Sequence, residues 1–164
     1  MNQKDYVLDS LKRNGLAAAK MLQEKAAEMT GTELYAEGEY IPDFVAACKK
    51  QNMLERHAGQ TDGFVCRSSA GRVVRLIQNY DSTVWTHTDG SLWEPEELPA
   101  QWGFKWSTDP KDALPFVAIS TSPYNTGECC TNEVDGMVKT FRSKIDGNVH
   151  SPDAYPQGWE EVAQ

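Results

Sequence analysis

The stretch that decides the fold is GRVVRLIQNYDST at residues 71–83, because a related stretch, GMVKTFRSKIDGN, returns at residues 136–148. Each copy places a glycine before a run of apolar and polar residues, which is typical of a β-strand entered from a turn. Each copy then closes with a proline-rich motif and a tryptophan, PEELPAQW at 95–102 and PDAYPQGW at 152–159. Internal self-similarity of this kind indicates a duplicated structural unit. We therefore predict two small β modules of one kind.

The two copies align at several glycine, cysteine, apolar and aromatic positions. A module of about 40 residues has a marginal hydrophobic core, so the large aromatic side chains should supply most of it. Trp102, Phe141 and Trp159 are the residues that we expect in these cores. The aligned pairs are Cys66 with Cys130, Gly71 with Gly136, Val73 with Val138, Leu76 with Phe141, and Trp102 with Trp159.

The N-terminal region reads as a helix over residues 4–29, since it is rich in Ala, Leu, Lys and Glu and contains no proline. Alternating steps of three and four residues predict an imperfect coiled-coil stripe along it. We expect this helix to assemble the chain into a homo-oligomer or to connect it to a larger assembly, although folding back onto its own body is an equally open alternative. The stripe consists of Leu8, Leu11, Gly15, Ala18, Leu22, Lys25 and Met29.

Beyond this helix the pattern predicts an α+β fold. Residues 31–40 look extended and acidic, and a second helix should begin at Ile41–Pro42 and run through residues 43–54. Short β-type runs follow, broken by Gly, Pro, Asp and Asn. The predicted organisation is a helical assembly or connector region at 1–59, a first β module at 60–106 and a second at 107–164. The runs are GFVCR, RVVRLIQNY, STVWTHT, WGFKWS, FVAIS, GECCT and MVKTFRSK.

Composition excludes several classes of function. The formal net charge of −8 argues against nucleic-acid binding, which needs clustered Lys and Arg. No apolar run approaches the length of a membrane helix, and the N-terminus lacks a signal-peptide pattern. The four cysteines lack the spacing of a zinc site, so we expect thiols in a reducing compartment and no metal. No cofactor is expected either.

The second copy resembles the type 3 chitin-binding module, a small carbohydrate-binding β domain. The resemblance rests on an aromatic, a turn, a glycine before a strand with an aromatic, and a closing tryptophan. Residues 30–164 also look like the C-terminal region of tail-associated proteins encoded by phages and prophages of Gram-positive bacteria. That resemblance implies a virion location, other tail proteins as partners, and attachment to host cell-surface polysaccharide. The residues that carry the first resemblance are Tyr124, Gly127, Glu128, Gly136, Phe141 and Trp159.

One departure from the sugar-binding family places the expected site in the first copy. The second copy has Ile145 and Asp146 where that family typically presents exposed aromatic rings, whereas the first copy has Tyr80 followed by an insertion rich in aromatics. A flat aromatic face next to polar groups can bind a sugar. Packing of Tyr80 and Trp85 between the modules is the open alternative. The candidate carbohydrate-binding residues are Tyr80, Trp85, Trp93, Tyr124 and Tyr155.

The sequence gives little support for an enzyme. No Ser or Cys lies in a recognisable nucleophile motif, and the three histidines, His57, His87 and His150, suggest no triad. The neighbouring carboxylates Glu94, Glu96 and Glu97 could hardly flank one glycosidic bond from opposite sides. We therefore expect a non-enzymatic tail protein that binds saccharide weakly. The alternative is a structural spacer or protein-docking module of the tail without sugar binding.

Overall fold

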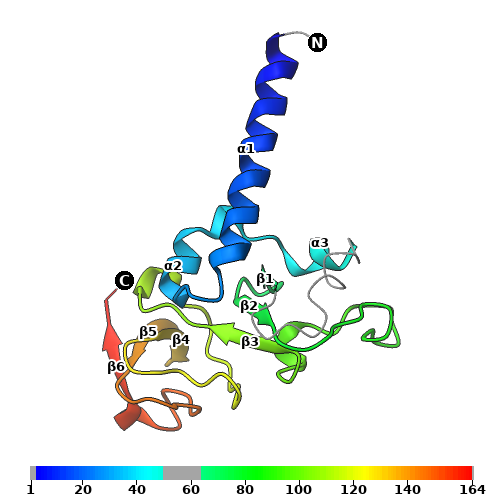
Figure 1. Cartoon of the computed structure of the whole chain (residues 1–164). Helices are drawn as coiled ribbons and strands as arrows, with labels where there is room; N and C mark the ends of the chain where they lie inside the picture. Colours follow the sequence, from blue (N-terminus) through cyan, green and yellow to red (C-terminus); the bar gives the residue numbers. More distant parts are fainter. Residues whose placement is uncertain (1–2, 50–63, 164) are drawn as a thin grey trace.

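The computed structural model describes residues 3–49 and 64–163. It confirms the α+β fold, with an N-terminal helix followed by two three-stranded antiparallel sheets in the orders β1-β2-β3 and β4-β5-β6 (Figure 1). The two sheets therefore have the same meander topology. Their strands are β1 (Val65–Arg67), β2 (Val73–Leu76), β3 (Trp102–Lys105), β4 (Cys129–Val134), β5 (Met137–Ser143) and β6 (Trp159–Val162).

In the central strand, the residues that are structurally equivalent in the two copies are shifted by two positions from those that the sequence alignment matches. Cys66 pairs with Val74 in the first sheet, whereas Cys130 pairs with Phe141 in the second. The closing tryptophans agree with this shift, since Trp102 pairs with Leu76 and Trp159 with Ser143. A shift of two residues keeps the same face of a strand inward, so the hydrophobic pattern could not reveal it.

The shift arises from the first hairpin of each module. Asp135 and Gly136 alone join β4 to β5, and both have positive φ, at 52° and 77°, as a two-residue type I′ turn requires. The β1–β2 connection is longer and includes Gly71 at φ 85°. The glycines match in sequence, but they serve turns of different length.

Helix α1 (Gln3–Lys25) projects away from the β body, with the N-terminus at its far end (Figure 1). Only its C-terminal end is buried, through Leu22, and Ala26 in the following turn is also buried. The apolar stripe continues outward from Leu22 with Leu11 at 61% exposure and Leu8 at 46%. The helix ends before Met29, which lies four residues beyond Lys25.

The prediction of an extended segment at residues 31–40 is wrong. A helix, α2 (Gly31–Ala36), and a 3₁₀ turn, η1 (Gly38–Tyr40), occupy it. Thr30 and Glu33 form a capping box, in which each side chain accepts a hydrogen bond from the other residue's backbone N–H. This signature, T-x-x-E, was present in the sequence. Helix α3 (Phe44–Lys49) matches the start of the second predicted helix, and residues 50–54 of that prediction lie outside the described residues.

The first sheet packs on both faces. Val65 and Val73 contact the helical region through Leu22, Ala26, Leu34 and Ile41. The opposite face joins a larger core that contains residues of both sheets: Cys66, Val74, Trp102, Cys130 and Trp159. Phe141 packs at the edge of this core, and Trp102 and Trp159 lie within it. The two modules therefore share one core.

A row of aromatic rings forms the centre of that shared core. Phe104 stacks on Trp106, Trp106 stacks on Tyr124 with ring centroids 4.3 Å apart, and Tyr124 meets the edge of Trp159. Such contacts add to the stabilisation from buried area alone. The row links β3 of the first sheet to β6 of the second.

Two predicted β runs do not form strands. STVWTHT contributes only an isolated bridge between Thr86 and Leu92, and in FVAIS the neighbouring Pro115 makes a single parallel bridge with Thr131. Both segments are connections that lie against the core, so their apolar residues reflect packing of loops. Strand β6 was not among the predicted runs, because two consecutive glutamates follow Trp159.

Candidate functional site

A surface hairpin in the first module brings two of the candidate residues, Trp85 and Trp93, together with His87. The backbone N–H of Trp93 donates to the carbonyl of Trp85 at 3.0 Å, and the N–H of His87 donates to that of Ser91 at 2.8 Å. Gly90, at φ 85°, closes the turn, a conformation that glycine adopts without strain. The hairpin thereby places Trp85, His87 and Trp93 together.

The rings of this hairpin form an aromatic platform, which we define as Trp85, His87 and Trp93. His87 stacks on Trp93 with ring centroids 4.9 Å apart and an interplanar angle of 9°, and Trp85 meets Trp93 edge to face at 6.0 Å. All three side chains are partly exposed. Edge-to-face and stacked rings at these distances attract each other, so the platform holds its shape.

A carboxylate lies at the edge of the platform. Nε2 of His87 is 3.1 Å from Oε1 of Glu97. The hydrogen bond from the backbone of Glu94 and the contact with His87 hold the pKa of Glu97 below its ordinary value. An ionised carboxylate beside partly exposed indole rings offers both a ring face and hydrogen-bond acceptors, which a sugar needs.

Two of the predicted site residues are corrected. Tyr80 and Tyr124 are only 4% and 1% exposed, so neither ring can stack on a ligand at the surface. Tyr80 packs against Phe44 and Trp102, and its hydroxyl donates to the carbonyl of Trp93 at 2.9 Å. It anchors the hairpin to the core. Tyr124 belongs to the row of aromatic rings between the modules.

Tyr155 is exposed, but it lies on the second module, whereas the platform lies on the first. Its ring meets His150 edge to face and covers Gly158, where a Cβ would lie 2.6 Å from the tyrosine ring. Tyr155 is 38% exposed. It remains a candidate for a second, isolated sugar contact.

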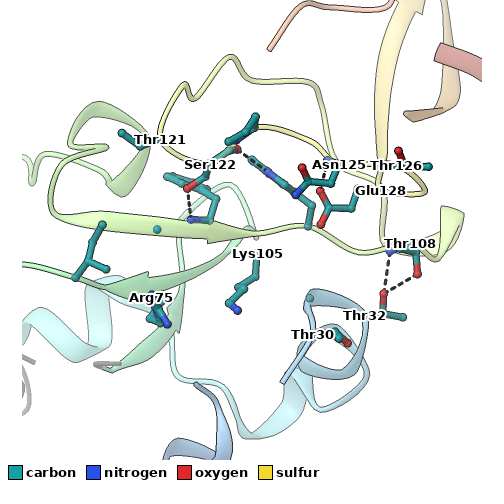
Figure 2. A pocket seen from close by; sticks show the side chains of 16 residues that line it. Thr30, Thr32, Arg75, Lys105, Thr108, Thr121, Ser122, Asn125, Thr126 and Glu128 are labelled. Carbon is teal, nitrogen blue, oxygen red and sulfur yellow. Dashed lines mark hydrogen bonds between the residues drawn. The ribbon is translucent and has the colours of Figure 1, made fainter. Parts of the chain in front are cut away.

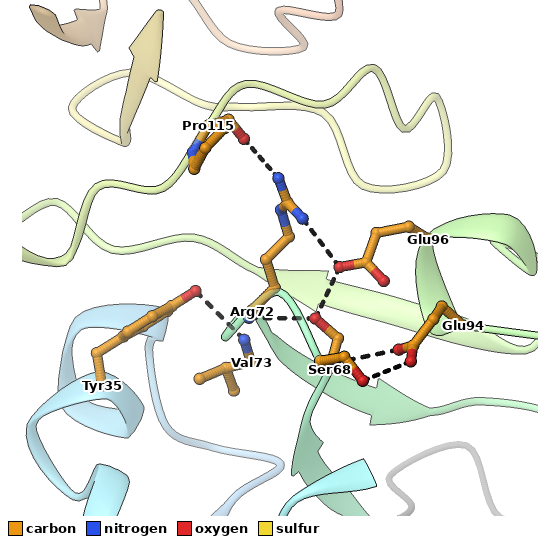
Figure 3. Close-up of polar contacts among 8 residues, drawn as sticks. Tyr35, Ser68, Arg72, Val73, Glu94, Glu96 and Pro115 are labelled. Atoms are coloured by element: carbon orange, nitrogen blue, oxygen red, sulfur yellow. Dashed lines mark hydrogen bonds and ion pairs between the residues drawn. The ribbon is translucent and has the colours of Figure 1, made fainter. Parts of the chain in front are cut away.

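The carboxylates that precede Glu97 serve a structural purpose. Arg72 is buried and donates to Oε1 of Glu96 at 3.0 Å and to the carbonyl of Pro115 at 2.6 Å (Figure 3). Ser68 donates to the same oxygen of Glu96 at 2.7 Å, and Ser69 hydrogen-bonds to Glu94. Arg72 directly precedes β2, so it connects this strand to η2 (Pro95–Glu97) and to the loop that leads into the second module.

The cysteines show no sign of reactivity in the described part of the chain. All four are buried and unpaired, and burial raises the pKa of Cys48 and of Cys130 to about 12. Neutral thiols are poor nucleophiles and poor metal ligands. Among residues 3–49 and 64–163, no group of three His, Cys, Asp or Glu side chains converges as a metal site would.

A cleft that the sequence did not reveal lies between the helical region and both modules. Its volume is about 540 Å³, within the range of small-molecule sites. β3 forms its floor, α2 borders one side, and residues 121–128 border the other (Figure 2). Hydrogen bonds fix its walls: Thr32 accepts from the N–H of Thr108 at 2.9 Å, and Ser122 accepts from the N–H of Phe104 at 2.9 Å.

Comparison with known proteins leaves the function open. No family model, curated protein or solved structure matches the chain. Over the described ranges, no helix combines the length and the apolar character that crossing a membrane would require.

Proposed function

We propose that this chain is a non-enzymatic, tail-associated adhesion protein of a phage or prophage, carried on the virion. Its aromatic platform binds a neutral face of a host cell-surface saccharide. The observation that carries the proposal is the partly exposed grouping of Trp85, His87 and Trp93 beside Glu97, on a hairpin anchored by Tyr80.

Trp85 and Trp93 pack against the shared core, as the alternative from the sequence allowed for Trp85, but both remain partly exposed. The exposed part of these rings, next to the carboxylate of Glu97, offers the apolar face and polar partner that a sugar site uses. The platform has a rigid base, because the hydroxyl of Tyr80 donates to the carbonyl of Trp93. Little conformational entropy is then lost when a ligand stacks on it.

The projecting helix supplies a means to raise the strength of attachment. The exposed part of the α1 stripe, at Leu8 and Leu11, is an apolar surface that a second copy of the same helix would cover. Joining weak sites in one assembly raises overall avidity by about two to four orders of magnitude where geometry lets them engage together. Weak sugar sites would suffice in such a homo-oligomer, which would dock on other tail proteins.

Retention on insoluble polysaccharide tests this proposal. The purified chain should sediment with chitin or with Gram-positive cell walls, and Trp85→Ala or Trp93→Ala should abolish retention while the variants stay folded. Val84→Ala is the matched control, because Val84 directly precedes Trp85, is 67% exposed and belongs to neither ring contact. Its retention should equal that of the wild type.

The competing function is a spacer or protein-docking module without a sugar site. Burial of Tyr80 and Tyr124 favours it, because two of the five expected stacking residues cannot reach a ligand. Absence of wild-type retention on both materials would replace adhesion by this alternative. Equal retention of the wild type and both tryptophan variants would place binding elsewhere on the molecule.

A further inference from the structure

The cleft between α2, β3 and residues 121–128 contains two cations on neighbouring strands. Arg75 on β2 lies opposite Gly103 on β3, and Lys105 lies two residues further along β3. Residues on one face at this diagonal spacing are close enough for long side chains to interact. Both cations project to the same side of β3 (Figure 2). Gly103 adds no side chain between them.

Arg75 and Lys105 are partly buried and form no ion pair with a carboxylate, unlike the other buried or partly buried basic side chains of the described residues. Within residues 3–49 and 64–163, every arginine except Arg75 forms an ion pair with a carboxylate. Lys105 has no carboxylate at ion-pair distance in the same ranges, and its Nζ donates only to the carbonyl of Met29 at 3.4 Å. Burial and the neighbouring Arg75 lower the pKa of Lys105, and the carboxylate of Glu128 only partly offsets this. An anion beside this pair would relieve the repulsion between them.

The remaining polar groups of the cleft fit a hydroxylated molecule better than a bare ion. Glu128 lines the same cleft and accepts a hydrogen bond from the N–H of Asn125 at 2.6 Å. Most threonine and serine hydroxyls around the cleft already bond within the protein, so the charged groups are those left to hold a ligand.

We propose that this cleft binds an acidic saccharide unit, with its carboxylate or phosphate held by Arg75 and Lys105 and its hydroxyls by Glu128. The site is separate from the aromatic platform, and it requires no aromatic stacking. It would give an adhesion protein a second contact, selective for charge. Charge-assisted hydrogen bonds to such a group are stronger than neutral ones.

Chemical-shift titration of the full chain tests the site with three probes: glucuronate, glucose 6-phosphate and neutral glucose. At least one acidic probe should shift the backbone amide signals of Gly103 and Lys105 in a saturable way, while glucose should not. A response to glucuronate alone identifies a carboxylate ligand, and a response to glucose 6-phosphate alone identifies a phosphate ligand. High salt should weaken either response.

Three variants locate the binding. Arg75→Gln and Lys105→Gln should each raise the Kd at least about tenfold, since each removes a charge-assisted hydrogen bond. Gly103→Ala keeps both charges but narrows the space between them, and it should also weaken binding. A Cβ at Gly103 would have no heavy-atom neighbour closer than 3.9 Å, so the variant should fold. Lys20→Gln, an exposed α1 residue, is the matched charge control.

Several results would overturn the site. The site is ruled out if the cleft signals stay unchanged with both acidic probes. It is also ruled out if glucose shifts them equally at the same concentration. Alternatively, Arg75→Gln and Lys105→Gln could bind as the wild type and as Lys20→Gln do. Loss of retention on chitin by Trp85→Ala would leave these titrations unaffected, so the two sites are tested separately.

Discussion

At the residue scale, Arg72 is a charged side chain that connects the two modules. It is buried, and it joins Glu96 of η2 to the carbonyl of Pro115 at the entry to the second module. Removing one partner of a buried ion pair leaves the other charge without compensation, which costs about 3–5 kcal/mol. Arg72→Ala should therefore lower the free energy of unfolding by about that amount in urea titrations followed by tryptophan fluorescence.

Arg142→Ala is the matched control for that measurement. Its partner, Glu160, lies on the neighbouring strand at 3.3 Å, but both side chains are at least a third exposed. An exposed pair of this kind contributes about 0–1 kcal/mol. Similar losses of stability for the two variants would show that burial of Arg72 is not what makes its contacts strong.

Glu128 should give the protein a specific pH dependence of stability. Burial raises the pKa of its carboxyl above the ordinary value of 4.5. The folded state therefore binds the proton more tightly than the unfolded state, and stability falls as the pH rises from below 4.5 through the raised pKa. Glu128→Gln cannot ionise, so its stability relative to wild type should increase across that window in urea titrations at successive pH values.

An exposed carboxyl that is hydrogen-bonded to the same loop, Asp146, acts in the opposite direction. Hydrogen bonds from Thr126 lower the pKa of Asp146, so its contribution is present at neutral pH and lost in acid. For this reason the difference between Glu128→Gln and wild type, rather than either profile alone, reports on Glu128. A difference that stays constant from acid to neutral pH would contradict the assignment.

At the element scale, α2 is fixed by one close backbone approach. A Cβ at Gly31 would lie 1.9 Å from the carbonyl oxygen of Trp106, and backbone atoms cannot move aside cheaply. Overpacking of this kind typically costs about 1–3 kcal/mol, and sometimes more. Gly31→Ala should lower the melting temperature, and Gly38→Ala, whose nearest neighbour is 3.9 Å away, should leave it nearly unchanged. Equal melting temperatures for both variants would rule out the close approach.

The elements that the sequence predicts well are those set by local rules. The turn at Gly136 and the long α1 helix both have strong local signals. Helix α2 was missed because its acidic composition hid the capping box at Thr30 and Glu33. The cleft could not be predicted, because Arg75, Lys105 and Glu128 come together only through the contact of separate elements.

The same distinction between local and long-range contacts explains which candidate site residues lie at the surface and which are buried. Trp85 and Trp93 lie in one short hairpin, so their proximity follows from a local turn. Tyr80 and Tyr124 were expected at the surface, but each meets rings from distant segments and is buried. Sequence position alone does not distinguish an aromatic platform from an aromatic core when the core is shared between two modules.

At the scale of the whole molecule, the projecting α1 should hold copies of the chain together. Leu11→Asp places a charge on the exposed stripe and should shift light-scattering mass, measured during size-exclusion chromatography, from oligomer to monomer. Leu16→Asp is the matched control, because Leu16 is 71% exposed and lies off the stripe. A monomeric wild type, or identical behaviour of the two variants, would contradict assembly through this face.

The most direct test of the central claim follows the five tryptophan indole N–H signals by nuclear magnetic resonance during titration with soluble chitooligosaccharides and with solubilised cell-wall fragments. Trp102, Trp106 and Trp159 are buried, whereas Trp85 and Trp93 lie on the platform. The account predicts saturable shifts of the Trp85 and Trp93 signals with at least one of these ligands and little change in the other three. Unchanged Trp85 and Trp93 signals with both ligands would contradict it.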